Sequence, residues 1–205
     1  MMKRIQEEMQ SLKCDDKIVS LSFGTLVMTV IFAFLLVIAT FTQIKFNFSW
    51  AGWGTYSYVP QIPIVMLIAI VLGPRFGLMS ILLYVVAGLF LPIYALGGGI
   101  HYILEYSFGY ILAYLPAVYI AGKIIERGYT IRNIMLSVVF CVFTIHIIGT
   151  FYLMLVVLIK NDPMYYIYDF LVLQSGVKII FDLIFTIAAA LIAQPIKQVL
   201  WITMS

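Results

Sequence analysis

The sequence predicts an all-α integral membrane protein built as a bundle of six transmembrane helices. Composition and the lengths of the apolar stretches predict this class. Of the 205 residues, 64% are hydrophobic and 10% are charged, and the mean hydropathy is +1.10. An ordinary soluble domain carries about 25% charged residues. A water-soluble fold could not bury so much apolar surface, so we expect lipid to cover most of it.

A helix needs roughly 20 mostly apolar residues to cross a hydrocarbon core about 30 Å thick, because each residue adds about 1.5 Å. Six stretches qualify, the second only marginally: 18–44, 60–72, 76–92, 100–122, 134–159 and 170–193. Gly73, Pro74 and Arg75 separate the second stretch from the third. We expect a tight turn there, since glycine gives backbone freedom and proline lacks a donor. Pro195 is expected to end the last hydrophobic stretch.

Residues 1–17 are polar and mixed in charge, and we expect them to form a cytoplasmic segment before a substrate-binding membrane domain, 18–205. The apolar run that follows them is too long for a signal-peptide core and lacks a clear cleavage site, so we expect it to be the first retained span. Cytoplasmic loops are enriched in Lys and Arg. With both termini cytoplasmic, only Lys45 and Lys160 fall outside and Lys178 lies within the last span. The cytoplasmic basic residues are then Lys3, Arg4, Lys13, Lys17, Arg75, Lys123, Arg127, Arg132 and Lys197.

Two loops on the expected outer side have an unusual composition. Segment 45–58 is rich in aromatic residues and glycine, and segment 93–99 ends in three consecutive glycines. One interpretation is an interfacial aromatic belt, formed by Trp50, Trp53, Tyr56 and Tyr58. The other is that both loops fold over a ligand, with aromatic faces packing on it and glycines allowing a close backbone approach.

Enzyme signatures are missing from the sequence. It contains no GxSxG, no HExxH, no Walker A motif and no set of Asp, Glu or His with metal-ligand spacing. Cys14 and Cys141 suggest neither a disulfide framework nor a metal site, and the net charge of +3 does not indicate nucleic-acid binding. We therefore expect no catalytic activity, metal or bound cofactor, and any active transport must draw energy from a partner or an ion gradient.

Ionisable residues inside apolar stretches are candidates for function, because a charge at the bilayer centre costs from about 2.5 kcal/mol upward. His101 and Glu105 are four residues apart in one stretch, and Lys178 and Asp182 are four apart in another. Each pair shares a helical face and could be a structural polar pair or part of a ligand site. Lys178 could bind a ligand carboxylate while Asp182 holds it in place. His146, alone in an apolar stretch, is expected to pack or to bond to the backbone.

Small residues recur every four positions in the first stretch, at Thr25, Thr29 and Ala33. Such a row lets another helix approach closely. It could dock a partner protein or pack within this chain.

Several motifs occur in a characteristic order between residues 59 and 128. They are Gln61, LGPRFG at 72–77, Leu83-Tyr84, LPIYALGGG at 91–99, Gly109-Tyr110 and ERG at 126–128. In this order and spacing they resemble the BioY family, the biotin-specific S components of energy-coupling-factor (ECF) importers. The resemblance covers about a third of the chain without gaps.

The resemblance implies a six-helix S component in the bacterial cell membrane that binds biotin from outside. It also implies a transmembrane coupling protein and a pair of cytoplasmic ABC-type ATPases as partners, which use the ATP, and a docking role for Thr25, Thr29 and Ala33. The substrate-binding residues that we expect are Gln61, Tyr84, Tyr94, Gly97, Gly98, Gly99, His101, Glu105, Ser107, Lys178 and Asp182.

The chain departs from the family pattern at two places. The family commonly has GPTGGY where this chain has EYSFGY at 105–110, and a GDxxK pattern on the last helix where this chain has Gly176, Val177 and Ile180. Lys178 and Asp182 could substitute for that pattern with shifted geometry. Two alternatives therefore stay open: an S component for another small carboxylate or vitamin, and a membrane scaffold without a ligand.

Overall fold

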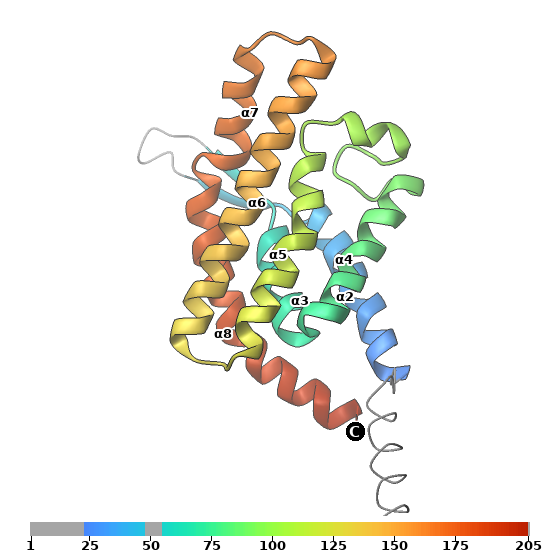
Figure 1. The fold of residues 1–205 in the computed structure, drawn as a ribbon, viewed down its shortest axis with the longest axis vertical. Helices are drawn as coiled ribbons and strands as arrows, with labels where there is room; N and C mark the ends of the chain where they lie inside the picture. Colours follow the sequence, from blue (N-terminus) through green and yellow to red (C-terminus); the bar gives the residue numbers. More distant parts are fainter. Residues whose placement is uncertain (1–22, 48–54, 205) are drawn as a thin grey trace, which may run out of the picture.

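The computed structural model describes residues 23–47 and 55–204, with side chains described up to residue 200. Most of this part of the chain is helical (Figure 1). The elements in chain order are α2 (Phe23–Phe41), β1 (Ile44–Asn47), β2 (Thr55–Tyr58), α3 (Gln61–Val71), α4 (Gly73–Phe90), the 3₁₀ helix η2 (Ile100–Leu104), α5 (Phe108–Glu126), α6 (Ile131–Lys160), α7 (Tyr165–Ser175) and α8 (Lys178–Met204). The predicted N-terminal segment 1–17, the start of the first span and Trp50 and Trp53 lie outside the described residues.

In the part of the chain that the structure describes, each of the six predicted membrane spans contains a helix. Among the described residues, five helical stretches are long and apolar enough to cross a membrane, with α7 and α8 up to Leu200 counted together. The sixth, α3, has 11 residues, which at about 1.5 Å per residue is too short to cross. Nearly every α3 side chain is buried, and the helix packs against α2, α4, α5 and α8. An evenly apolar helix of this kind forms the centre of the bundle.

The turn between α3 and α4 is tighter than the three-residue turn that the sequence predicts. Leu72 alone separates the helices, and Gly73 begins α4 with a positive φ of 74°. Pro74 and Arg75 already belong to the first turn of α4, where the missing N–H of a proline costs no hydrogen bond. The glycine therefore makes the turn and the proline starts the next helix.

Three sequence-based boundaries are wrong. The fourth span does not begin at residue 100, because η2 occupies Ile100–Leu104 and Glu105 is extended before α5 starts. The sixth span is interrupted at Gly176, between α7 and α8. Pro195 does not end the last helix, which continues to Met204; Lys197 Nζ donates to the Ile70 carbonyl at 3.1 Å and so ties this part of α8 to α3.

A short antiparallel hairpin interrupts the otherwise helical fold. β1 and β2 pair with Lys45 opposite Ser57 and Phe46 opposite Tyr56. The hairpin lies beside α8, where Phe46 stacks on Phe181 with ring centroids 4.9 Å apart. The aromatic segment 45–58 is thus partly a β-hairpin packed on the bundle.

Basic residues gather at one end of the bundle. Figure 1 shows the α3–α4 turn, the α5–α6 loop and the end of α8 at that end, and the α6–α7 loop and η2 region at the other. Five of the described basic residues belong to the first end: Arg75, Lys123, Arg127, Arg132 and Lys197. This distribution has the asymmetry that is typical of a cytoplasmic face.

Candidate binding site

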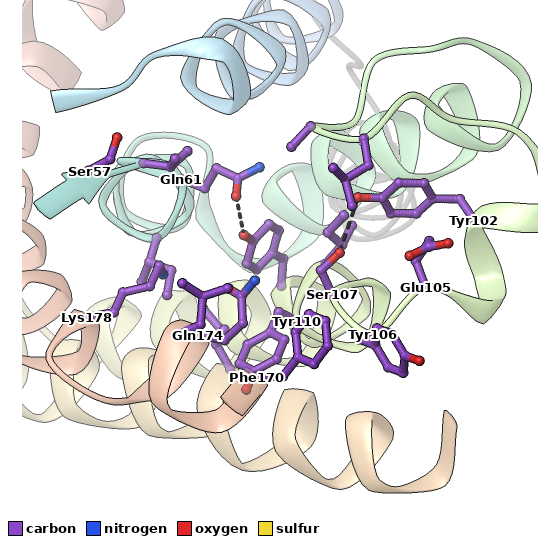
Figure 2. Close-up of a pocket in the computed structure, with 18 residues that line it drawn as sticks. Ser57, Gln61, Tyr102, Glu105, Tyr106, Ser107, Tyr110, Phe170, Gln174 and Lys178 are labelled. Carbon is purple, nitrogen blue, oxygen red and sulfur yellow. Dashed lines mark hydrogen bonds between the residues drawn. The ribbon is translucent and has the colours of Figure 1, made fainter. Parts of the chain in front are cut away.

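A cavity of about 530 Å³ opens between α3, α5, α6, α7, α8 and the 95–107 segment. Its size falls in the range of small-molecule sites, about 300–1,000 Å³. Figure 2 shows polar side chains around it and aromatic rings along one wall. The lining residues are Ser57, Val59, Gln61, Ile62, Ala95, Leu96, Tyr102, Glu105, Tyr106, Ser107, Tyr110, Ile111, Tyr114, Ile145, Phe170, Leu173, Gln174 and Lys178.

The Gln61 side chain, at the first residue of α3, is held by hydrogen bonds with residues of three other helices. Its Nε2 donates to Thr40 Oγ1 on α2 at 2.9 Å and to the Tyr84 hydroxyl on α4 at 3.2 Å. The Tyr114 hydroxyl on α5 donates to Gln61 Oε1 at 3.1 Å. Side chains held in this way keep one rotamer, so the amide presents a fixed polar surface to the cavity.

Lys178, the first residue of α8, supplies positive charge to the cavity. Its Nζ lies 2.9 Å from Asp182 Oδ2, one turn later on the same helix. The side chain is 17% exposed, whereas the Asp182 side chain is fully buried. An ammonium group has three donors, and this ion pair uses one. Lys178 thus forms the predicted ion pair and also lines the cavity, and its binding of a ligand carboxylate stays a prediction.

A buried hydrogen-bond network surrounds Asp182. Tyr58 donates to Oδ1 at 2.8 Å, and His146 Nε2 lies 3.0 Å from Oδ2. The other ring nitrogen of His146 lies 2.9 Å from Ser175 Oγ. His146 was expected to pack or to bond to the backbone; it bonds two side chains instead. The network joins the hairpin, α6, α7 and α8 behind Lys178.

Tyr58 anchors the hairpin to α8. Its ring stacks on Phe185 with centroids 5.0 Å apart, while its hydroxyl reaches Asp182. Burial, followed by the charge of Asp182, raises the pKa of Tyr58, so the hydroxyl stays protonated and donates. The next residues on either side, Ser57 and Val59, line the cavity. Ser57 of segment 45–58 therefore borders the cavity, and covering of a ligand by this segment stays a prediction.

The opposite end of the cavity is formed by residues just before α5. The hydroxyls of Tyr102 and Ser107 lie 3.2 Å apart. Tyr106 donates to Asp162 in the α6–α7 loop, and its ring packs on Phe170 with centroids 4.4 Å apart. These contacts join the 102–107 segment to α7 across the cavity rim. Glu105 also lines this end.

The BioY family model matches residues 9–201, almost the whole chain. The chain belongs to the BioY family. A probable biotin transporter BioY of Lysinibacillus sphaericus is 35% identical over 104 residues, 50% of this chain and 50% of that protein. The probable biotin transporter BioY of Pyrococcus horikoshii is 45% identical over 64 residues, 30% of this chain and 40% of that protein. The chain thus spans about half or less of the length of these curated relatives.

A crystal structure of the S-component for biotin from an ECF-type ABC transporter has the same fold. It matches with a TM-score of 0.63 and 20% sequence identity, over 85% of this chain and 90% of the other. The predicted six-helix S-component bundle is confirmed by this match together with the helices described above.

Four of the residues predicted from the BioY resemblance line the cavity: Gln61, Glu105, Ser107 and Lys178. Tyr84 and Asp182 lie behind the wall, where they hold Gln61 and Lys178. The remaining predicted residues are not at the cavity surface. Tyr94 is buried and donates to the Val85 carbonyl at 2.7 Å, so it supports the fold.

The three glycines of the BioY-like LPIYALGGG motif support a loop rather than line the cavity. Gly97 pairs with Tyr94, and the Gly99 amide donates to the Gly88 carbonyl of α4 at 3.0 Å. The same loop does reach the cavity, through Ala95 and Leu96. His101 is exposed on η2 and is not among the lining residues, so it does not share a face with Glu105.

The lining residues that the sequence did not predict as substrate-binding are mostly aliphatic or aromatic. Tyr110, Ile111 and Tyr114 share one face of α5, and Phe170, Leu173 and Gln174 share one face of α7. Their spacing of three and four residues indicates from the sequence that they share a helical face. Without the fold, a row of this kind cannot be told from a lipid-facing aromatic row.

The row of small residues on α2 faces the bundle. Thr29 and Ala33 are each 5% exposed. Ser80 of α4 donates to the Thr29 carbonyl at 2.9 Å, which places α2 close against α4. Thr29 and Ala33 therefore pack within this chain, the second of the two alternatives, whereas Thr25 is half-buried. Docking of a partner at these three residues stays a prediction.

Close contact between α5 and α6 sets the position of Tyr110. A Cβ on Gly149 would lie 2.4 Å from the Tyr110 ring. Gly149→Ala is therefore expected to displace the ring, which lines the cavity, and to destabilise the protein by about 1–3 kcal/mol through overpacking. Thermal unfolding in detergent and ligand titration would measure both effects. Ile147→Ala, on an exposed face of the same helix, is the control; equal behaviour of the two variants would contradict the prediction.

Proposed function

We propose that this chain is the substrate-capturing subunit of a vitamin importer and that it binds biotin from the outer face of the bacterial cytoplasmic membrane. The observation that carries the proposal is a cavity with a positioned cation, Lys178, at the end of the bundle opposite the basic residues. The BioY relatives are described as probable biotin transporters, which supports biotin as the ligand.

The lining side chains suit each part of biotin. Lys178 can donate to the valerate carboxylate in a charge-assisted hydrogen bond. The apolar faces of Tyr110, Tyr114 and Phe170 can pack on the hydrocarbon chain and the sulfur-containing ring. Gln61 Oε1 accepts one bond from Tyr114 and keeps a second lone pair for a ligand N–H, and Ser107 can bond the ureido group in place of its bond with Tyr102.

Both chain termini lie in the cytoplasm in this proposal. The gathering of basic residues at the α3–α4 and α5–α6 connections supports that orientation. Because the sequence contains no Walker A motif, ATP-driven uptake requires partner subunits: a transmembrane coupling protein and a pair of ABC-type ATPases. The chain itself captures and releases the vitamin without chemical conversion.

Equilibrium binding of radiolabelled biotin to the purified, folded protein tests the proposal. Saturable binding that unlabelled biotin displaces is the expected result. A folded protein that binds no biotin would overturn the biotin assignment.

A second candidate ligand, another small carboxylate or vitamin, is favoured by Glu105, which stands where the family commonly has glycine. A thermal-shift screen over vitamins and related small acids separates the two. Stabilisation by biotin alone supports the first candidate, and stabilisation only by another acid supports the second.

A further inference from the structure

We propose that Glu105 is a specificity-determining residue that selects ligands with an N–H donor or a cationic nitrogen at the end opposite the carboxylate. This inference rests on the proposed function and concerns the same cavity. Lys178 selects for a carboxylate at one end of the ligand, and Glu105 adds the requirement for a nitrogen donor at the other end.

The cavity wall carries two charged side chains of opposite sign. Of the described lining residues, only Lys178 and Glu105 are charged. Figure 2 shows them on opposite sides of the cavity, Lys178 next to Gln174, and Glu105 near Ser107 and Tyr106. A ligand that spans the cavity therefore meets a cation at one end and an anion at the other.

The two charges differ in their protein partners. Lys178 is paired with Asp182 at 2.9 Å. Within residues 23–47 and 55–204, the Glu105 carboxylate has no hydrogen bond or ion pair to another side chain. A carboxylate is an acceptor with about four lone-pair sites. An N–H group of the ligand placed there would complete a charge-assisted hydrogen bond, whereas a second anion would be repelled.

Other hydroxyl groups at this end are already engaged. Tyr102 and Ser107 bond each other at 3.2 Å, and Tyr106 donates to Asp162. Glu105 is thus the strongest available acceptor at this end. The ligand is oriented with its carboxylate toward Lys178 and its nitrogen-bearing end toward Glu105.

The test compares biotin with biotin diamine, in which the ureido carbonyl has been removed by hydrolysis to leave two amines. Both carry the same valerate carboxylate, but only the diamine is cationic. Glu105→Gln removes the negative charge and keeps a carbonyl acceptor. Glu126→Gln is the matched control, because Glu126 forms an exposed ion pair with Lys123 at the other end of the bundle.

We expect the wild-type protein and Glu126→Gln to bind both compounds, with dissociation constants within about tenfold of each other. Glu105→Gln is expected to weaken binding of the diamine by about tenfold or more and binding of biotin by less than about threefold, because charged hydrogen bonds are roughly twice as strong as neutral ones. Isothermal titration calorimetry measures both.

Two results would overturn the inference while leaving the proposed function intact. One is biotin binding without diamine binding by the wild-type protein, and the other is an unchanged ratio of the two affinities in Glu105→Gln. A wild-type protein that binds neither compound would overturn the proposed function, and the inference with it.

Discussion

Asp182→Ala is expected to lower the free energy of unfolding by about 3–5 kcal/mol, the cost of breaking a buried charge pair by removing one partner. Asp182 is fully buried and bonds Tyr58, His146 and Lys178. Its removal leaves the Lys178 ammonium without its counter-ion and the Tyr58 hydroxyl without an acceptor. Thermal unfolding of the detergent-solubilised protein is the measurement.

The control for this variant is Asp169→Asn, because Asp169 is an exposed acid on α7. Exposed substitutions usually change stability by less than about 0.5 kcal/mol, so its melting temperature should match that of the wild type. If Asp182→Ala melted at the same temperature as Asp169→Asn, the buried network would not hold the hairpin, α6 and α8 together as described.

Lys178→Met is expected to weaken binding of biotin by about tenfold to 100-fold. A hydrogen bond to a charged group contributes about 1.5–3 kcal/mol, and 1.4 kcal/mol corresponds to tenfold in affinity. The remaining Asp182 carboxylate would also repel the ligand anion. Methionine keeps much of the length and apolar stem of lysine, so the loss of biotin affinity measures the contribution of the positive charge.

Biotin methyl ester provides the internal control for Lys178→Met, since it lacks the anion and should bind the wild-type protein and the variant about equally. Lys123→Met, an exposed basic residue at the other end of the bundle, should leave binding of both compounds unchanged. Equal losses for biotin and its methyl ester would show that Lys178 does not bind the carboxylate.

The sequence predicts the spans well because hydropathy reports which residues avoid water. It cannot report where the backbone changes its hydrogen bonding. The 3₁₀ helix at Ile100–Leu104, the break at Gly176 and the passage of α8 through Pro195 all lie in apolar stretches that read as continuous helix or as a helix end. A tertiary contact, the bond from Lys197 to the Ile70 carbonyl, ties the part of α8 beyond Pro195 to α3, and hydropathy does not report such a contact.

For the cavity, the sequence singles out the polar residues better than the apolar ones. Gln61 and Lys178 stand out because a polar group in an apolar stretch is costly in a membrane and therefore indicates a structural or functional role. Tyr110 and Phe170 do not, because the same residue types also face lipid. His146 could not be placed from sequence, since its partners Ser175 and Asp182 are 29 and 36 residues away.

Cysteine accessibility tests the central claim, a biotin-binding cavity open to the exterior, most directly. Ala95 lines the cavity and is exposed, so Ala95→Cys can be introduced after Cys14 and Cys141 are replaced by alanine. Arg132→Cys, at the opposite end of the bundle, is the control. In intact cells, a membrane-impermeant maleimide should label Ala95→Cys but not Arg132→Cys, and biotin should protect the former. Labelling of Ala95→Cys only after permeabilisation, or labelling that biotin does not slow, would contradict the account.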